Sequence, residues 1–406
     1  MRLLFLTPQL PYPPMQGTSL RNFYLMRELA RRHDVSLLTF LQPGDQWDAA
    51  SPLHQICRAV RAVPAPPRRS LLARAFAAMA SPLPDMALRL SSPDFARALL
   101  EWVEREPFDG VQVEGIEMAP YGLMLKRQRV RLVFDDHNAE YALQHSAFRA
   151  DARAPLRWHA VLYSLIQWQK LARYERVVLG GHDAIAAVSD ADARALAALG
   201  TGKPITVVPN GVDTEEYAPQ GEAKGGACAL VFTGKMDYRP NVDAALWFAE
   251  EILPRVRARL RQARFVIVGQ QPHARLAALG RRSDVLITGA VPDVRPYIAG
   301  AAVYVAPLRM GSGTRLKLLQ AMAMAAPVVS TTLGCDGLGV QDGREALLAD
   351  SASAFADAVI RLAQDPDLRR ALAARARQHV VEQFDWQSIA PRLEPLYTAA
   401  GGGSDG

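Results

Sequence analysis

Short apolar runs alternate with longer amphipathic stretches from the first residues of the chain. Residues 2–7 form a compact apolar run, a Pro-rich loop leads to Gly17, residues 19–32 have helical spacing, and a second apolar run covers 35–40. Uninterrupted apolar runs of this length are typical of strands that are buried on both faces. The same kind of run recurs at 110–113, 130–134, 184–188 and 205–208. The pattern predicts a parallel sheet with helices on both faces.

Breaks in this rhythm divide the chain. The Pro-rich segment 61–69 predicts a loop, 81–84 predicts a second break, and the turn-rich segment 209–226 predicts a domain junction. Beyond it, strand and helix patterns alternate again. The expected strands are 229–232, 264–268, 285–288, 303–306 and 328–331, and the expected helices are 241–260, 273–280, 293–299 and 314–325.

The chain therefore predicts two Rossmann-like, doubly wound α/β domains. We expect the first over 1–212 and the second over 213–385, with a C-terminal helix at 386–400 that crosses back to the first domain. Two such domains imply a cleft between the carboxyl ends of two sheets, where ligands of these folds bind. The Gly-rich residues 401–406 predict a disordered tail.

Composition narrows the class of protein. The 406 residues are enough for two cores, and 50% apolar with 22% charged residues is ordinary for a globular protein. The net charge of +6 favours anionic partners, but no basic run interleaved with aromatic residues indicates nucleic acid. The three cysteines lack the spacing of a disulfide framework or a zinc site. With no signal-peptide or membrane-span pattern, we expect a cytoplasmic protein, acting in the cytosol or at the inner face of the membrane.

The segment 307–332 is the most informative one, because it joins a strand end, a small-residue loop, two cations and an Ala-rich helix. Gly311 and Gly313 permit close backbone approach, and the N–H groups of Gly313, Thr314 and Arg315 at the helix start predict an anion site. Lys317 adds a cation. The alternative is an ordinary strand-loop-helix unit in which Arg315 and Lys317 are solvated.

Lys317 and Gln320 lie three residues apart, so a helix beginning near Gly313 places both on one face. A cation beside an amide that both donates and accepts hydrogen bonds suits a diphosphate next to a sugar hydroxyl. The segment thus favours a phosphate-containing ligand.

Several motifs, in this order, resemble the family-4 glycosyltransferases of GT-B fold over nearly the whole chain. The motifs are Pro13–Arg21, Phe134–Glu140, Val188–Ser189, Val208–Asp213, Thr233–Lys235, Thr288–Asp293 and Ala306–Ser330. The resemblance implies a hexosyltransferase-type enzyme that moves a sugar from a nucleotide-diphosphate donor, with retention of configuration, to a saccharide or lipid-linked acceptor in polysaccharide or glycolipid biosynthesis. It implies no bound metal and no other cofactor.

Site residues carry over position by position, with the donor in the second domain and the acceptor in the first. The resemblance and the strand-end positions assign catalytic roles to His137, Lys235 and Arg315, donor binding to Gly17, Ala290, Val291, Ser312, Gly313, Thr314, Lys317 and Gln320, and acceptor binding to Arg21, Glu114 and Glu117. We expect His137 to orient and stabilise the transferred sugar, and Asp135 or Asp136 to cap the next helix or orient His137.

For most of these residues an ordinary structural role stays open beside the functional one. Lys235 is also explained as a surface lysine, Gly17 as a turn glycine, and Arg21 as a structural or surface residue. Glu114 and Glu117 are also explained as solvated loop carboxylates.

Three positions depart from the family pattern. Ser312 and Gln320 stand where relatives commonly carry two glutamates, and Asn241 stands where many carry a lysine. An amide in place of a carboxylate loses a charge-assisted hydrogen bond, worth about 1 to 2 kcal/mol more than a neutral one. Ser312 and Gln320 support an alternative: a catalytically impaired nucleotide-sugar-binding partner of an active transferase. A Rossmann oxidoreductase is disfavoured, because no G-x-G-x-x-G follows the first strand.

The segment 154–178 carries apolar residues at helical spacing with basic residues between them. Such a stripe is typical of a core helix, and also of a helix that lies on an anionic membrane near a lipid-linked acceptor. Core packing is the preferred interpretation.

Overall fold

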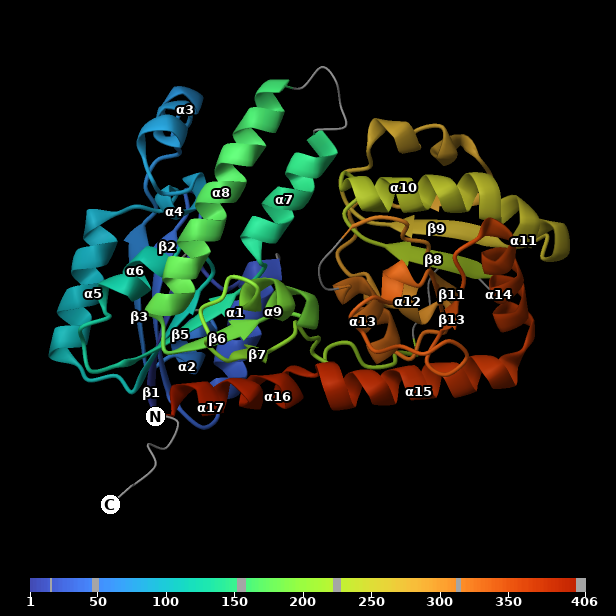
Figure 1. Cartoon of the computed structure of the whole chain (residues 1–406). Coiled ribbons are helices and arrows are strands. Elements are labelled where there is room, and N and C mark those ends of the chain that lie inside the picture. The colour runs from blue at the N-terminus through green and yellow to red at the C-terminus, as the bar shows by residue number, and fades with distance from the viewer. Residues whose placement is uncertain (15–16, 46–50, 152–157, 222–227, 312–314, 399–406) are drawn as a thin grey trace. The chain divides into compact units, whose positions relative to one another are not determined.

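The computed structural model describes residues 1–14, 17–45, 51–151, 158–221, 228–311 and 315–398 (Figure 1). The donor residues Ser312, Gly313 and Thr314 and the predicted tail 401–406 lie outside this range. The chain divides into two compact units. Unit 1 comprises Met1–Pro209 together with the residues from Ile389 onward, and unit 2 comprises Asn210–Ser388.

Unit 1 contains a parallel sheet in the order β3-β2-β1-β4-β5-β6-β7. Its strands are β1 (Arg2–Thr7), β2 (Asp34–Leu41), β3 (Ala59–Pro64), β4 (Gly110–Glu114), β5 (Arg131–Asp136), β6 (Ala184–Ala187) and β7 (Ile205–Val207). The strands expected from apolar runs in this part of the chain are confirmed. The loop predicted over 61–69 is wrong for residues 61–64, which belong to β3. There β3 forms an edge strand, a position in which the proline at its end, Pro64, is tolerated.

Helices of unit 1 connect these strands. They are α1 (Gly17–Leu29), α2 (Leu53–Ile56), α3 (Leu71–Ala80), α4 (Asp85–Leu88), α5 (Pro93–Arg105), α6 (Ala119–Met124), α7 (Glu140–Asp151), α8 (Trp158–Gly181) and α9 (Asp190–Ala197), and near the C-terminus η5 (Ala390–Leu393) and α17 (Glu394–Tyr397). The C-terminal segment packs on the sheet, where Tyr397 donates a hydrogen bond from its hydroxyl to Gln112 Oε1 at 2.9 Å. In place of one long C-terminal helix, the structure has several short ones.

Unit 2 contains a parallel sheet in the order β10-β9-β8-β11-β12-β13. Its strands are β8 (Ala229–Thr233), β9 (Arg264–Val268), β10 (Val285–Ile287), β11 (Ala301–Ala306), β12 (Val328–Ser330) and β13 (Leu347–Leu348). Its helices are α10 (Arg239–Trp247), η1 (Phe248–Ile252), α11 (Leu253–Arg259), η2 (Ala274–Leu276), η3 (Leu279–Arg281), α12 (Arg295–Ala299), α13 (Leu316–Ala323), η4 (Leu333–Cys335), α14 (Ala352–Gln364) and α15 (Pro366–Phe384), followed by α16 (Trp386–Ile389) at the boundary with unit 1.

Both faces of the unit 2 sheet are covered, as its uninterrupted apolar strands require. Along β8, Leu230 and Phe232 pack into one core cluster, whereas Ala229 and Val231 pack into another. All four side chains are fully buried. Successive residues of a strand point to opposite faces, so a strand between two helical layers needs apolar residues at every position.

The apolar stripe of 154–178 is divided along α8. Toward the C-terminal end of the helix, Leu171, Tyr174 and Val178 are buried in the core of unit 1. This part of the helix agrees with the preferred interpretation of the sequence, core packing. Toward the N-terminal end, Leu162 is 51% exposed. No helix in the described part of the chain has the length and apolar content needed to cross a membrane.

Candidate active site

The candidate residues lie on the side of each sheet where its strands have their carboxyl ends. The order reverses between β1 and β4 in unit 1, and between β8 and β11 in unit 2. In open α/β sheets, ligands bind beyond the carboxyl ends of strands at such a reversal. The described candidate residues lie in two groups, one for each unit.

In unit 1, Arg21 of α1 and Asp135 of β5 form a buried ion pair. Arg21 donates from Nε and Nη2 to the two oxygens of Asp135, both at 2.9 Å, and from Nη1 to the Pro209 carbonyl at 3.2 Å. Their side chains are 1% and 0% exposed. Of the two roles predicted for Arg21, this geometry favours the structural one, because the guanidinium is engaged inside the unit rather than open to an acceptor phosphate.

Beside this pair, Glu114 at the end of β4 is bound to His137, which follows β5. His137 Nε2 lies 2.8 Å from Glu114 Oε2, and Glu114 is fully buried. Burial lowers the pKa of His137, but the hydrogen bond and charge of Glu114 outweigh it and leave that pKa raised. Burial and the charge of Asp135 raise the pKa of Glu114. Glu114 thus favours the protonated form of the imidazole and orients the ring.

The ligand atoms of Glu114, Asp135 and His137 lie within 4.8 Å of one another, a spacing that a metal site also has. Here these groups already bind each other and Arg21. A guanidinium against both oxygens of one carboxylate opposes a cation at that carboxylate. These three residues therefore do not fit a metal ion.

A cavity of about 670 Å³ opens at the same edge of unit 1. Its walls include His137, Glu114 and Glu117 at one part, and the segment Ala65–Arg68 with Arg89 at another. Glu117 lies 3.6 Å from the Arg89 guanidinium and is 23% exposed. Both glutamates predicted to bind the acceptor therefore line the cavity. Glu114 is bound to His137 there, and Glu117 lies close to the Arg89 guanidinium.

The predicted helix-capping role of Asp135 or Asp136 is wrong for α7. The N–H groups at this helix start donate to residues from other helices: Ala139 to Asp192 Oδ1 at 3.1 Å, and Tyr141 to the Glu175 carboxylate at 3.2 and 3.3 Å. Asp135 is held by Arg21. Asp136 is buried, and this burial together with the charge of Glu175 holds its pKa well above the usual range.

In unit 2, the Lys317 side chain of α13 lies inside the site. Its ammonium donates to Asn241 Oδ1 and lies 4.6 Å from the centre of the Phe232 ring. Asn241 in turn donates to the Lys235 carbonyl at 2.8 Å. Burial and the charge of Arg315 lower the pKa of Lys317 from 10.5 to about 7. Asn241, at a position for which the resemblance implied a lysine, thus carries the amide that holds Lys317.

Gly234, directly after β8, makes room for this lysine. Its φ is +152°, and a Cβ there would lie 2.7 Å from Lys317 Nζ and 2.8 Å from Asn241 Nδ2. Gly269, after β9, is equally constrained, since its Cβ would lie 1.7 Å from the Gly234 carbonyl oxygen. Only glycine satisfies both positions. Gly234 belongs to the Thr233–Lys235 motif, whereas Gly269 has no motif around it that would have indicated it.

Arg315 precedes α13 and is 8% exposed. It donates from Nη2 to the Gly311 carbonyl at 2.8 Å and to the Leu333 carbonyl at 3.3 Å. The helix begins at Leu316 rather than near Gly313. Arg315 therefore ties the loop after β11 to η4, and burial lowers its pKa as it does that of Lys317.

Lys235, also predicted to contact phosphate, lies differently. Its side chain is 54% exposed and its ammonium lies 3.4 Å from Asp237. Although Lys235 follows Gly234 directly, the charge inside the site comes from Lys317. The surface role predicted as its alternative describes this position, and a phosphate contact stays a prediction.

Gln320 lies one turn beyond Lys317 on α13 and donates from Nε2 to the Tyr217 hydroxyl at 2.9 Å. This bond occupies the amide nitrogen. Tyr217 comes from the turn-rich segment after Val212, and burial raises its pKa to about 12, so the hydroxyl is neutral at physiological pH. Sequence reasoning missed Tyr217, because a contact between residues 103 positions apart has no local signal.

The remaining predicted donor residues lie at loop positions. Ala290 and Val291 follow β10 after Gly289, whose φ is +70°. Gly17 is the first residue of α1, and a Cβ there would meet no atom within 4 Å among those described. Nothing at these positions tests the predicted backbone contacts to a nucleotide, and the contacts stay predictions.

Two family models match successive parts of the chain. Residues 15–216 match Glycosyltransferase Family 4, and residues 227–365 match Glycosyl transferases group 1. The chain belongs to family 4 of the group 1 glycosyltransferases. The resemblance found in the sequence motifs is thereby confirmed.

Individual relatives are more distant. The chain is 30% identical over 211 residues to the phosphatidyl-myo-inositol mannosyltransferase of Mycolicibacterium smegmatis, which covers 50% of this chain and 53% of the relative. It is 25% identical over 290 residues to the lipopolysaccharide core biosynthesis mannosyltransferase LpcC of Rhizobium leguminosarum, covering 67% and 79%. The first match spans about half of its relative's length.

Solved structures support the fold. Sucrose-phosphate synthase from Thermosynechococcus elongatus superposes with a TM-score of 0.70 at 20% identity, covering 98% of both chains. HepE of Anabaena in complex with UDP and glucose gives a TM-score of 0.63 at 16% identity, covering 97% of this chain and 98% of the other. Together with the two parallel sheets, these likenesses confirm the predicted GT-B fold.

Proposed function

We propose that the protein is a retaining, metal-independent glycosyltransferase that moves a hexose from a nucleoside diphosphate to a saccharide or lipid-linked acceptor in polysaccharide or glycolipid biosynthesis. The observation that carries the proposal is the site at the β8/β11 reversal, where Lys317 lies between Asn241 and Phe232 next to a strand-end glycine. Family membership supports it.

The chemistry follows from charge. When the sugar leaves, negative charge develops on the β-phosphate, and preorganised cations and N–H donors stabilise it. Lys317, with a pKa near 7, takes up a proton as the diphosphate binds, and Arg315 holds the adjoining loop. A diphosphate thus supplies the counter-charge that the buried ammonium lacks.

In unit 1, the cavity beside His137 is the proposed acceptor pocket. Glu114 engages Nε2 of His137, so Nδ1 is the ring nitrogen that faces a sugar hydroxyl or a carbonyl, and the raised pKa favours the imidazolium, in which Nδ1 donates a hydrogen bond. We assign His137 an orienting and electrostatic role and Glu114 the role of positioning it.

The test is a thermal-shift screen against nucleoside diphosphates and their sugars. A ligand that binds only the folded protein stabilises it, by about 2.7 kcal/mol at a ligand concentration of 100 times Kd, and therefore raises the melting temperature. GDP-mannose comes first in the panel, because a relative is named as GDP-mannose-dependent. If folded protein shifts with none of the panel, the proposal fails. Activity that persists in EDTA supports metal independence, and activity abolished by EDTA and restored by a metal contradicts it.

A second candidate, an impaired nucleotide-sugar-binding partner, is favoured by one observation: Gln320 presents an amide whose nitrogen is bound to Tyr217. Gln320→Glu tests it, with Tyr217→Phe as a companion variant that frees the side chain. A large gain in turnover for Gln320→Glu supports impairment. Loss or no change shows that glutamine is the working residue.

A further inference from the structure

Large apolar side chains gather on the surface of unit 1 around α3. Among exposed large apolar residues of the described chain, Leu72 and Phe76 of α3 are 84% and 68% exposed. They lie four residues apart and so share one face of the helix. Leu83, Leu162 and Tyr163, from the loop after α3 and from α8, are also exposed. We name these five residues the α3 patch.

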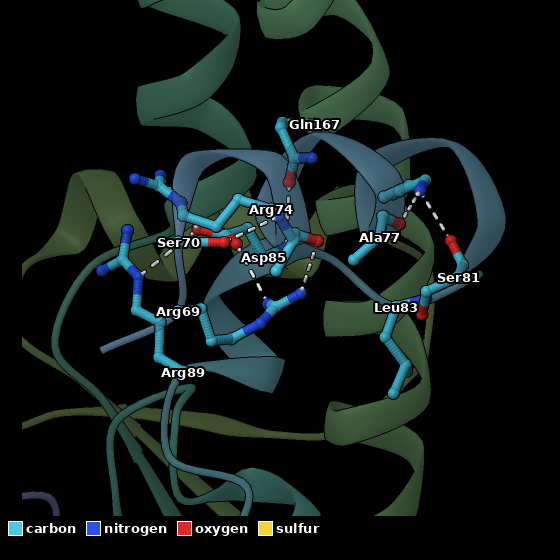
Figure 2. Close-up of polar contacts among 11 residues, drawn as sticks. Arg69, Ser70, Arg74, Ala77, Ser81, Leu83, Asp85, Arg89 and Gln167 are labelled. Carbon is cyan, nitrogen blue, oxygen red and sulfur yellow. Dashed lines mark hydrogen bonds and ion pairs between the residues drawn. The ribbon is translucent and has the colours of Figure 1, made fainter. Parts of the chain in front are cut away.

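The α3 patch is built on a fixed support. Asp85, at the start of α4, is 6% exposed. Its carboxylate accepts hydrogen bonds from Arg69 Nη1 at 3.2 Å and from Arg74 Nε at 3.1 Å (Figure 2). Its backbone N–H donates to Gln167 Oε1 of α8 at 3.1 Å. Arg89 Nε lies 3.8 Å from the same carboxylate. Arg89 also lies 3.6 Å from Glu117, so these three arginines and two carboxylates leave a surplus of one positive charge.

The other end of α3 is also held. Lys170 of α8 donates to the Ser81 carbonyl at 2.6 Å and to the Ala77 carbonyl at 3.4 Å, and Ser70 caps the helix start by accepting from Ala73 N–H at 3.2 Å. In Figure 1, α3 lies beside the end of α8 from which Leu162 comes. These contacts hold α3 in place while the side chains of Leu72 and Phe76 are exposed to solvent.

Charge decides which partner fits. Residues 65–92 contain four arginines and one aspartate, a formal charge of +3. A helix with exposed Leu and Phe side chains, flanked by guanidinium groups, matches the interface of an anionic lipid layer. An ordinary protein interface has charged residues depleted at its centre, and a second copy of this chain would bring the same positive charge against it.

The position of the acceptor cavity points the same way. The segments that flank the patch, Ala65–Arg68 before it and Arg89–Leu90 after it, line that cavity. An amphiphilic acceptor in the bilayer surface would have its polar head beside the cavity wall when α3 lies in the interface.

We propose that the α3 patch docks unit 1 on an anionic lipid surface, and that the acceptor is a lipid-linked molecule taken from that surface. The docking itself rests on the patch alone, and the acceptor class rests on the proposed function.

The test is flotation with vesicles of phosphatidylglycerol and phosphatidylcholine, compared with phosphatidylcholine alone. Wild type binds the anionic vesicles, and Leu72→Ser with Phe76→Ser weakens partitioning by at least about tenfold, because two large side chains leave the apolar layer. Both residues are exposed, so folding is retained. The matched control is Val177→Ser, a 59% exposed position of α8 outside the patch, which binds as wild type does. Raising salt from about 0.1 to about 1 M weakens binding, because the Debye length falls from about 10 to about 3 Å.

Three outcomes overturn the proposal: folded wild type that stays unbound on anionic vesicles, a double variant that binds as well as wild type, or a dimer in solution that the double variant dissociates. Calorimetry with nucleoside diphosphates on the same samples separates the two claims. Nucleotide binding without vesicle binding refutes the docking alone. Vesicle binding without nucleotide binding refutes the proposed function and leaves the docking.

Discussion

Replacing Lys317 with methionine should stabilise the unliganded protein and remove the proposed diphosphate site. The lysine ionises at pH 10.5 in the unfolded chain but at about 7 in the folded one. As pH falls from 10.5 toward 7, the unfolded chain binds a proton that the folded chain does not, so stability falls over this window. At about 1.4 kcal/mol per pKa unit, the full penalty is on the order of 5 kcal/mol and is reached below pH 7.

Methionine has no such penalty. The lost hydrogen bond to Asn241 offsets part of the gain, by about 1 kcal/mol. The difference in unfolding free energy between Lys317→Met and wild type should therefore favour the variant by roughly 3 kcal/mol at pH 7 and shrink by about that amount at pH 10. Urea unfolding at both pH values measures it, and Lys235→Met is the control, because that lysine is 54% exposed and should show no such pH dependence.

Binding gives the complementary readout. At pH 8 the free protein carries mostly neutral Lys317, so nucleoside diphosphate binding to wild type takes up about one proton. Calorimetry in buffers of different ionisation enthalpy counts this proton. If Lys317→Met has the same stability profile over pH as wild type, or binds with the same proton uptake, the reasoning is refuted.

Three further predictions concern the supports of the two sites. Glu114→Gln lowers the pKa of His137, because burial is then no longer outweighed by the carboxylate, and an NMR titration of the imidazole reports the shift. Gly234→Ala destabilises the protein by about 1 to 3 kcal/mol, because a φ of +152° strains a residue with a Cβ, and it weakens nucleotide binding, because that Cβ would lie 2.7 Å from Lys317 Nζ and displace it. Arg21→Met destabilises it by about 3 to 5 kcal/mol in urea unfolding, because it leaves the Asp135 carboxylate buried without its partner.

Each of these has an outcome that counts against it. An unchanged imidazole titration would show that Glu114 does not set the charge of His137. An alanine at 234 with full stability and nucleotide affinity would refute the close approach to Lys317. For the ion pair, the comparison is Arg97→Met, whose exposed pair with Asp94 should contribute under about 1 kcal/mol. Equal effects of the two arginine substitutions would contradict the buried geometry.

The local pattern of apolar residues was sufficient to predict the alternation of strands and helices. A parallel strand with both faces covered needs apolar residues at every position, as residues 229–232 show. It was insufficient for β3, whose proline suggested a loop and is tolerated only because the strand lies at a sheet edge. Edge position is a property of the whole sheet, which no local stretch contains.

The site shows the same division. The loop glycines and the Lys317–Gln320 spacing were readable from sequence, because backbone freedom and helical periodicity are local. The partners were not: Asn241 holds Lys317 across 76 residues, and Tyr217 holds Gln320 across 103. Both Lys235, predicted as catalytic, and Lys317, predicted to bind the donor, were expected in the site, and only packing separates the exposed cation from the enclosed one.

The central claim is that the Lys317 site serves sugar transfer from a nucleoside diphosphate. The most direct measurement is nucleoside diphosphate release from a panel of nucleotide sugars, with wild type and Lys317→Met compared and products examined by NMR. The account predicts release by wild type from at least one donor with retained anomeric configuration, reduced by about a hundredfold or more in the variant. Release at equal rates by both proteins, or none by folded wild type while acceptor lipids and saccharides are present, would contradict it.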